Sequence, residues 1–301
     1  MVCVQLINNK NIRKDNIMKL PFDLDLKGKT VVITGGGGVL CGVFAEAVGK
    51  CGANVAILDL RKEAADAVAE KINKDGGKAK GYAANVLKTD EMKAVREEIL
   101  KDFGKCDILI NGAGGNNPKG TTTKEYLDFE DIDGKEELVT FFDLDPEGVG
   151  FVFNLNFLGT LIPTQVFAKD MAKNKKGNII NISSMNAFTP LTKIPAYSGA
   201  KAAVSNFTQW LAVHFSRVGV RVNAIAPGFF VTNQNKALLF NEKGEPTPRT
   251  EKILAATPMD RFGEPEELVG TLLWLLNDEA SGFVDGVVVP VDGGFSAYSG
   301  V

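Results

Sequence analysis

Residues 30–42 read TVVITGGGGVLCG: a β-branched run, four consecutive glycines and then an apolar stretch. The run predicts a strand over Thr30–Thr34, and the residues after the glycines predict the start of a helix. Glycines permit a tight turn, and bare backbone N–H groups at a helix N-terminus bind phosphate groups. An ordinary strand-to-helix turn is the alternative, but this order near the start of the chain favours a dinucleotide pyrophosphate site. The residues expected to contact the pyrophosphate are Gly35, Gly37, Gly38, Val39 and Leu40.

A carboxylate follows the second predicted strand, Asn54–Leu58, which leads into Asp59 and Leu60. About 20 residues beyond such glycines, a carboxylate accepts a hydrogen bond from the ribose 2′-hydroxyl and repels a 2′-phosphate. The sequence therefore favours NAD over NADP as the cofactor, with Asp59 and Leu60 as predicted cofactor contacts. Two alternatives stay open: Arg61 could accommodate NADP, and Asp59 could instead be the N-cap of the next helix.

The rest of the chain alternates short β-branched runs with longer helical patterns, which is typical of βαβ units around a parallel sheet. No Pro-, Gly- or Ser-rich linker divides it. The predicted fold is therefore a single α/β domain, a doubly wound, seven-stranded parallel sheet with helices on both faces. The further predicted strands are 80–83, 108–110, 178–182, 221–225 and 287–289, and the predicted helices include 62–73, 89–103, 196–218 and 265–276.

Two segments, about 115–146 and 229–263, break this alternation with long polar stretches. Loops of that length in a compact domain are usually functional or disordered. Both leave the carboxyl ends of predicted strands, where open α/β sheets bind ligands, so they are predicted to form the substrate walls. The regular pattern begins near Leu26; residues 1–25 are predicted to be a flexible extension to a domain over 26–301.

The composition excludes several classes of partner. The chain has 34 Lys and Arg against 37 Asp and Glu, a net charge of −3, so it offers no strong field for nucleic acid or an acidic membrane surface. The four cysteines are scattered and predict neither a metal site nor a redox centre. Without an apolar run of about 20 residues or a secretory signal, a cytoplasmic protein is expected.

Tyr197 and Lys201 lie four residues apart in a helical pattern, so they share one helix face. A nearby cation stabilises phenolate and lowers a tyrosine's pKa from about 10 toward working pH, so Tyr197 can donate or accept a proton. Ser184, just past a predicted strand, could hold a substrate oxygen in line with the phenol. Taken singly, Ser184 and Asn156 are more often structural, and it is the order of all four residues that indicates a catalytic set.

Three features occur in the order typical of one family: the glycine turn, then the set Asn156, Ser184, Tyr197 and Lys201, and then Pro227-Gly228. From about Leu26 onward the chain therefore resembles the short-chain dehydrogenase/reductase family. The resemblance implies a Rossmann-type enzyme in which Tyr197 protonates a carbonyl oxygen and Ser184 polarises that carbonyl. Lys201 would lower the tyrosine's pKa and bind the nicotinamide ribose, and Asn156 would organise a water relay. The family pattern extends the cofactor site to Asn85, Val86, Asn111, Gly112, Ala113, Gly114, Tyr197, Lys201, Pro227, Gly228, Phe230 and Thr232.

Three positions depart from the family pattern. Val39 and Cys41 stand where the family usually carries the second and third glycines of its cofactor turn, which puts the individual pyrophosphate contacts in question. Asn85 stands where the family usually has an aspartate that contacts adenine. Most enzymes of this kind are symmetric oligomers, so a homotetramer is expected by analogy.

Within the family, the sequence resembles the D-mannonate oxidoreductase (fructuronate reductase) group, in segments 114–119, 184–188, 229–235 and 294–301. This implies reversible, NADH-dependent reduction of the ketone of D-fructuronate to D-mannonate. A sugar acid needs a cation and many hydrogen-bonding groups. The alternatives are a neutral sugar, polyol or 3-oxoacyl substrate, or a nucleotide-binding protein without turnover. The expected substrate contacts are Asn116, Lys119, Ser184, Asn186, Tyr197 and Asn233.

Overall fold

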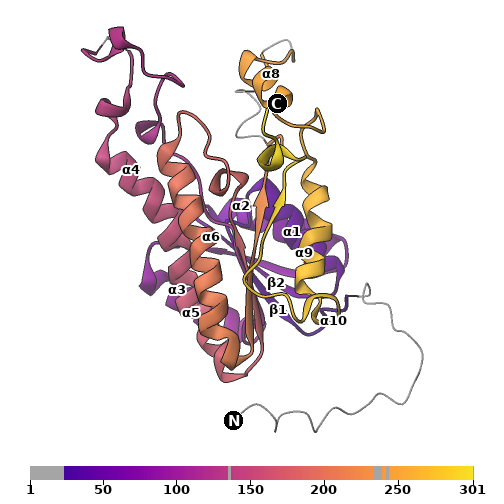
Figure 1. Cartoon of the computed structure of the whole chain (residues 1–301). Helices are drawn as coiled ribbons and strands as arrows, with labels where there is room; N and C mark the ends of the chain where they lie inside the picture. The colour runs from indigo at the N-terminus through magenta and orange to yellow at the C-terminus, as the bar shows by residue number, and fades with distance from the viewer. Residues whose placement is uncertain (1–23, 135–136, 233–238, 242–243, 301) are drawn as a thin grey trace, which may run out of the picture.

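The computed structural model describes residues 24–134, 137–232, 239–241 and 244–300. Its centre is a seven-stranded parallel sheet in the order β3-β2-β1-β4-β5-β6-β7, with helices on both faces (Figure 1). The order reverses at β1, so the predicted doubly wound, single-domain α/β fold is confirmed. The strands are β1 Thr30–Thr34, β2 Asn54–Asp59, β3 Lys78–Ala83, β4 Ile108–Asn111, β5 Gly177–Ile182, β6 Val220–Pro227 and β7 Val288–Val291.

The strands are buried on both faces because each is a near-continuous apolar run. Val31 and Ile33 of β1 point to one face and Val32 to the other, and all three are fully buried. The first face is covered by α1 (Val39–Lys50), α2 (Lys62–Lys74) and α9 (Val269–Leu276). The second is covered by α3 (Thr89–Asp102), α5 (Gly159–Lys173) and α6 (Pro195–Phe215).

The strand and helix predictions differ from the structure mainly at their ends. The last strand is 288–291 instead of 287–289, and it is a half-exposed edge strand that contains Pro290. Proline suits this position because a sheet edge needs no ladder hydrogen bond from that residue. The predicted helix 265–276 begins as a 3₁₀ turn, Pro265–Leu268, before α9.

One helical stretch, Pro146–Lys173, had no counterpart among the elements named from the sequence. It consists of α4 (Pro146–Phe153), a π-helical turn (Asn154–Leu158) and α5, with Pro163 inside. The π turn and the proline interrupt the 3.6-residue period, which explains why the pattern was weak. By length and composition the stretch could cross a membrane, but half of its most apolar window is buried inside the protein, as in a core helix.

Both long loops stand above the carboxyl edge of the sheet (Figure 1). Residues 116–145, called the arm below, leave β4 and contain three 3₁₀ turns, Pro118–Gly120, Phe129–Asp131 and Phe141–Asp143. The second loop leaves β6 and contains α8 (Pro248–Ala255), which was not predicted. Most of the predicted N-terminal extension lies outside the described residues; Leu24, inside them, packs against the core.

Candidate active site

The glycine turn lies where β1 and β4 meet at the carboxyl edge. Gly35 has φ +65°, and a side chain there would come within 2.9 Å of the Ala113 backbone. The hydroxyl of Thr34 accepts hydrogen bonds from the N–H groups of Gly112 (3.1 Å) and Ala113 (3.3 Å). Two of the predicted cofactor segments are therefore held together by a residue that the sequence analysis did not assign to the site. The sequence feature that could have indicated Thr34 is its polar side chain at the end of an otherwise apolar strand.

Cys41 explains how the turn tolerates the loss of a family glycine. Its side chain is buried at the start of α1, and a Cβ on Gly112 would lie only 2.1 Å from its Sγ. The Cys41 side chain on α1 therefore fits because Gly112, at the end of β4, has no side chain. Val39, the other departure within the turn, is partly exposed.

Asp59 contacts the glycine turn directly. Its Oδ2 accepts a hydrogen bond from Gly37 N–H (3.2 Å) and its Oδ1 accepts one from Arg61 N–H (3.1 Å). The N-cap of α2 is Arg61, so the alternative role of Asp59 as the cap residue is wrong. A carboxylate beside a glycine turn fits the ribose of a dinucleotide. Leu60 next to it is largely exposed.

The other predicted cofactor residues lie around this turn with different roles. Asn85 accepts a hydrogen bond from Leu87 N–H through its Oδ1 (2.9 Å), and Val86 is buried in the core. The predicted cofactor segment after β6 begins at Gly228, where a side chain would lie 2.5 Å from the Asp292 backbone. The side chain of Phe230 is buried in the core and packs against Gly263, and its contact with the cofactor stays a prediction. Thr232 and Pro227 flank this segment.

Asn156 lies in the π-helical turn and is completely buried. Its Nδ2 donates to the carbonyls of Gly115 and Val152 (both 2.8 Å), and its Oδ1 accepts from Gly115 N–H (3.3 Å). A Cβ on Gly114 would lie 2.6 Å from that Oδ1 and 3.2 Å from Lys201 Nζ. Asn156 and Lys201 therefore meet at Gly114, where a bulkier residue would separate them.

Lys201 and Tyr197 share one face of α6 as predicted, with Lys201 Nζ 5.6 Å from the tyrosine ring centre. Lys201 Nζ donates to the carbonyl of Ile182 (2.8 Å). Burial lowers the pKa of Lys201 from 10.5 to about 8. Burial also raises the pKa of Tyr197 to about 12, and a hydrogen bond with Ser184 is the contribution that lowers it. Ser184 is therefore the group that acts on the phenol here, and the lowering of the Tyr197 pKa by Lys201 stays a prediction.

The Lys201 pKa leads to a prediction on stability. Between about pH 8 and pH 10.5 the unfolded chain holds a proton on Lys201 that the folded chain has lost, so folding becomes more favourable as pH rises through this window. Relative to Lys201→Met, the wild type should gain about 3 kcal/mol of unfolding free energy across it. Urea denaturation at pH 7 and pH 10.5 measures the difference. A constant difference between the two proteins would show that Lys201 is not desolvated.

Apart from Ser184 and Tyr197 themselves, Asn186 is a predicted substrate residue that contacts the catalytic set directly. Its backbone N–H donates to Ser184 Oγ (3.2 Å), and its side chain is buried. Among the described residues its Oδ1 has no hydrogen-bond partner. Asn116 is exposed and donates to Thr121 Oγ1 (3.1 Å), and Lys119 is exposed and pairs with Asp145 at 3.3 Å. Asn233 lies outside the described residues.

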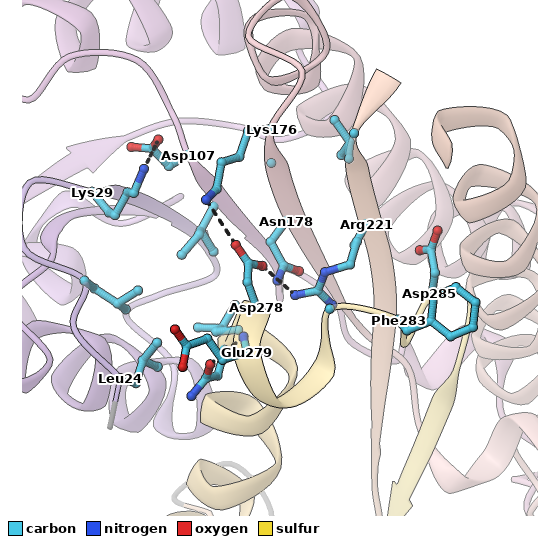
Figure 2. A pocket seen from close by; sticks show the side chains of 18 of the residues that line it. Leu24, Lys29, Asp107, Lys176, Asn178, Arg221, Asp278, Glu279, Phe283 and Asp285 are labelled. Atoms are coloured by element: carbon cyan, nitrogen blue, oxygen red, sulfur yellow. Dashed lines mark hydrogen bonds and ion pairs between the residues drawn. The ribbon is translucent and has the colours of Figure 1, made fainter. Parts of the chain in front are cut away.

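A separate cavity of about 870 Å³ opens at the amino edge of the sheet, between the starts of β4, β5 and β6 (Figure 2). Its cations are matched by carboxylates: Lys29 pairs with Asp107 (3.2 Å), and Lys176 (3.2 Å) and Arg221 (3.0 Å) both pair with Asp278. Open α/β sheets bind their ligands at the other, carboxyl edge. This cavity is therefore not the site that the glycine turn and Tyr197 define.

Together, a parallel sheet with a glycine turn at its switch point and a Tyr–Lys pair beside it define a Rossmann-type oxidoreductase. The short chain dehydrogenase family matches residues 29–243, so the chain belongs to that family. It is 64% identical to an uncharacterised oxidoreductase of Haemophilus influenzae, covering 94% of this chain and 99% of that one. It is 51% identical to the uncharacterised oxidoreductase UxuB of Bacillus subtilis, covering 94% of this chain and all of that one.

A solved structure shares both the fold and much of the sequence. It belongs to an inferred D-mannonate oxidoreductase from Haemophilus influenzae and was crystallised with bound NAD. The TM-score is 0.89 at 64% identity, over 93% of this chain and 99% of that one. The resemblance to the family that the sequence motifs indicated is therefore confirmed.

Proposed function

We propose that the protein is an NAD(H)-dependent oxidoreductase that interconverts D-fructuronate and D-mannonate. The observation that carries the assignment to a hydroxylated, sugar-like substrate is Asn186 Oδ1, a buried acceptor without a partner among the described residues, beside Ser184. A buried unpartnered acceptor is costly unless a ligand supplies the donor, and sugar hydroxyls are donors. The name and the bound NAD of the Haemophilus influenzae structure support the same substrate and cofactor.

The residues present fit a dinucleotide. Glycines leave the turn open, and Asp59 stands beside Gly37 for the ribose hydroxyls. Lys201, at Gly114, would reach the nicotinamide ribose. When bound, NADH supplies the hydride that the ketone carbon receives.

The chain's own residues handle the proton. Tyr197 donates its phenolic proton to the ketone oxygen as that carbon is reduced, which gives the alcohol and leaves a phenolate. Ser184, hydrogen-bonded to Tyr197, holds the same oxygen in place. The Lys201 cation would stabilise the phenolate once the site fills, and Asn156 positions the Gly114–Gly115 backbone beside it. Asn116, Lys119, Asn186 and Asn233 are the proposed substrate contacts.

The first experiment follows NADH oxidation with D-fructuronate, in parallel with NADPH and with neutral ketoses and 3-oxoacyl esters. Rapid turnover with the uronate and NADH is expected. Activity on another substrate but not on the uronate would retain the enzyme class and overturn the sugar-acid assignment. Binding of NADH without turnover on any of them would favour a nucleotide-sensing protein.

Asp59 should determine the preference of the enzyme for NADH over NADPH. Removing a charged partner of the ribose hydroxyls costs roughly 1.5–3 kcal/mol, so Asp59→Ala should raise the KM for NADH by roughly 10- to 100-fold. The KM for NADPH should fall, because the repulsion of the 2′-phosphate is gone. Glu63→Ala, an exposed carboxylate at the start of α2, is the control and should leave both KM values unchanged. An unchanged ratio of the two KM values in Asp59→Ala would remove Asp59 from the ribose site.

We also propose a cytoplasmic homotetramer. The exposed face of α6 supports self-association, because Trp210, stacked between Phe207 and His214, is more than half exposed and Val213 beside it more so. Exposed apolar patches of this kind mark protein interfaces. Light scattering coupled to size-exclusion chromatography measures the mass directly, and a monomer at assay concentration would contradict the proposal.

A further inference from the structure

The arm and α8 meet at an ion pair between Glu125 Oε1 and Lys252 Nζ, 2.8 Å apart. The arm leaves the carboxyl end of β4, and the segment with α8 leaves the carboxyl end of β6 (Figure 1). β5 lies between these two strands, and Ser184 follows its carboxyl end. The ion pair therefore bridges the two substrate loops on the side of the sheet where the catalytic residues lie.

Two further cations lie on the segments that meet at this ion pair. Lys193 lies four residues before Tyr197, and its backbone carbonyl accepts a hydrogen bond from Thr122 N–H of the arm (2.8 Å). Arg249 precedes Lys252 by three residues on α8, so the two share a helix face. The hydrogen bond from Lys252 and the charges of Lys252, Lys193 and Arg249 all hold the pKa of Glu125 below its ordinary value.

This cluster carries more positive than negative charge. Among the described residues, Lys193 and Arg249 have no ion-pair partner of their own, and Glu125 is the carboxylate that pairs with Lys252. Other cations of the arm are compensated: Lys119 pairs with Asp145, and Lys124 with Asp128 and Asp131. The excess charge therefore gathers at the meeting point of three separate loops, and Lys193 holds a left-handed backbone conformation there, φ +71°. Such strain in a non-glycine residue concentrates at functional sites.

We propose that Lys193, Arg249 and Lys252 form the subsite that binds the carboxylate of the substrate, with Glu125 occupying that subsite until an anionic substrate displaces it. The assignment rests on the proposed sugar-acid function and identifies the residues that select for the acid. Charge-assisted hydrogen bonds from several cations bind a carboxylate more strongly than a single exposed cation does. An excess of positive charge at the mouth of a site also raises the local concentration of an anionic substrate.

The test compares Lys193→Met, Arg249→Met and Lys252→Met with wild type on D-fructuronate and on D-fructose, a neutral ketose. Each variant should lower kcat/KM for the acid roughly 10-fold or more, mainly through KM, and leave the value for the neutral ketose unchanged. Lys169→Met, an exposed lysine on α5, is the control and should change neither. Lys119→Met should affect the acid less than the cluster variants do, since Asp145 already shares its charge.

The variant Glu125→Gln distinguishes two roles for the ion pair. In the first, Glu125 occupies a carboxylate subsite; in the second, it only holds the two loops together. If Glu125 competes with the substrate, its removal should lower the KM for D-fructuronate several-fold; if the pair only holds the loops together, KM should rise for both substrates. Titration of D-mannonate into the enzyme–NADH complex should show the same order of affinities without turnover. Equal effects of the lysine and arginine variants on acid and neutral substrate would overturn this inference, whereas a wild type that prefers the neutral ketose would overturn the proposed function itself.

Discussion

Tyr197→Phe should lower kcat by roughly 10²- to 10⁴-fold, the contribution typical of a positioned proton donor. The phenol is partly buried, hydrogen-bonded by Ser184, and lies on the same helix face as Lys201. The variant deletes one oxygen atom and keeps the ring, so packing against α4 is preserved. Because its effect is confined to the proton transfer, the dissociation constant of NADH should stay close to that of wild type.

Steady-state kinetics with D-fructuronate measure kcat, and fluorescence titration measures NADH binding. Tyr298→Phe, at a half-exposed tyrosine near the C-terminus, is the matched control and should leave both unchanged. A Tyr197→Phe enzyme with an undiminished rate would show that another group supplies the proton. A large loss of NADH binding would mean that the residue acts through the cofactor site instead.

Gly112→Ala should destabilise the protein by about 1–3 kcal/mol, the usual cost of overpacking a close contact, and should weaken NADH binding. The new methyl group would lie 2.1 Å from Cys41 Sγ and 3.0 Å from the carbonyl oxygen of Thr34. Relief requires the first turn of α1 or the end of β4 to move, and both carry the glycine turn. Urea denaturation measures the stability loss.

The cause can be isolated by a second substitution. Cys41→Ala removes the sulfur and leaves only Cβ, which lies 3.6 Å from the added methyl group. In the double variant most of the lost stability should return, although the contact with Thr34 remains. Gly150→Ala is the control: no atom lies within 4 Å of its added methyl group, so the α4 helix should be unaffected or slightly stabilised. If Cys41→Ala fails to restore Gly112→Ala, the Cys41 contact is not the source of the loss.

The strands and helices that could be predicted from the sequence are those with a clear local pattern of apolar residues. The run Thr30–Thr34 is a strand end to end, and the helix 62–73 differs from the observed α2 by one residue. Apolar period and β-branching act within a few residues, so they can be read without tertiary contacts. The arm could not be predicted in the same way, because its polar sequence carries no period, and α8 is only eight residues long, shorter than the window over which a helical period can be recognised.

The catalytic residues were predictable for a similar reason. Tyr197 and Lys201 are neighbours on one helix, so their spacing alone brings them together. The electrostatics were not predictable from spacing: the direction of the Tyr197 pKa shift depends on burial and on Ser184, which lies on another element. Phe230 is a comparable case, since only packing against Gly263 shows that its side chain belongs to the core.

The parallel α/β fold, the glycine turn with its carboxylate and the Tyr–Lys pair could be predicted from the sequence, because each depends on residues close together along the chain. Other features come from tertiary packing: Gly112 makes room for Cys41, Asn186 keeps a buried acceptor that has no partner among the described residues, and the segments that carry Lys193 and α8 meet the arm beside Glu125. Those features join segments separated by many residues, and their partners are chosen by how the strands are ordered in the sheet.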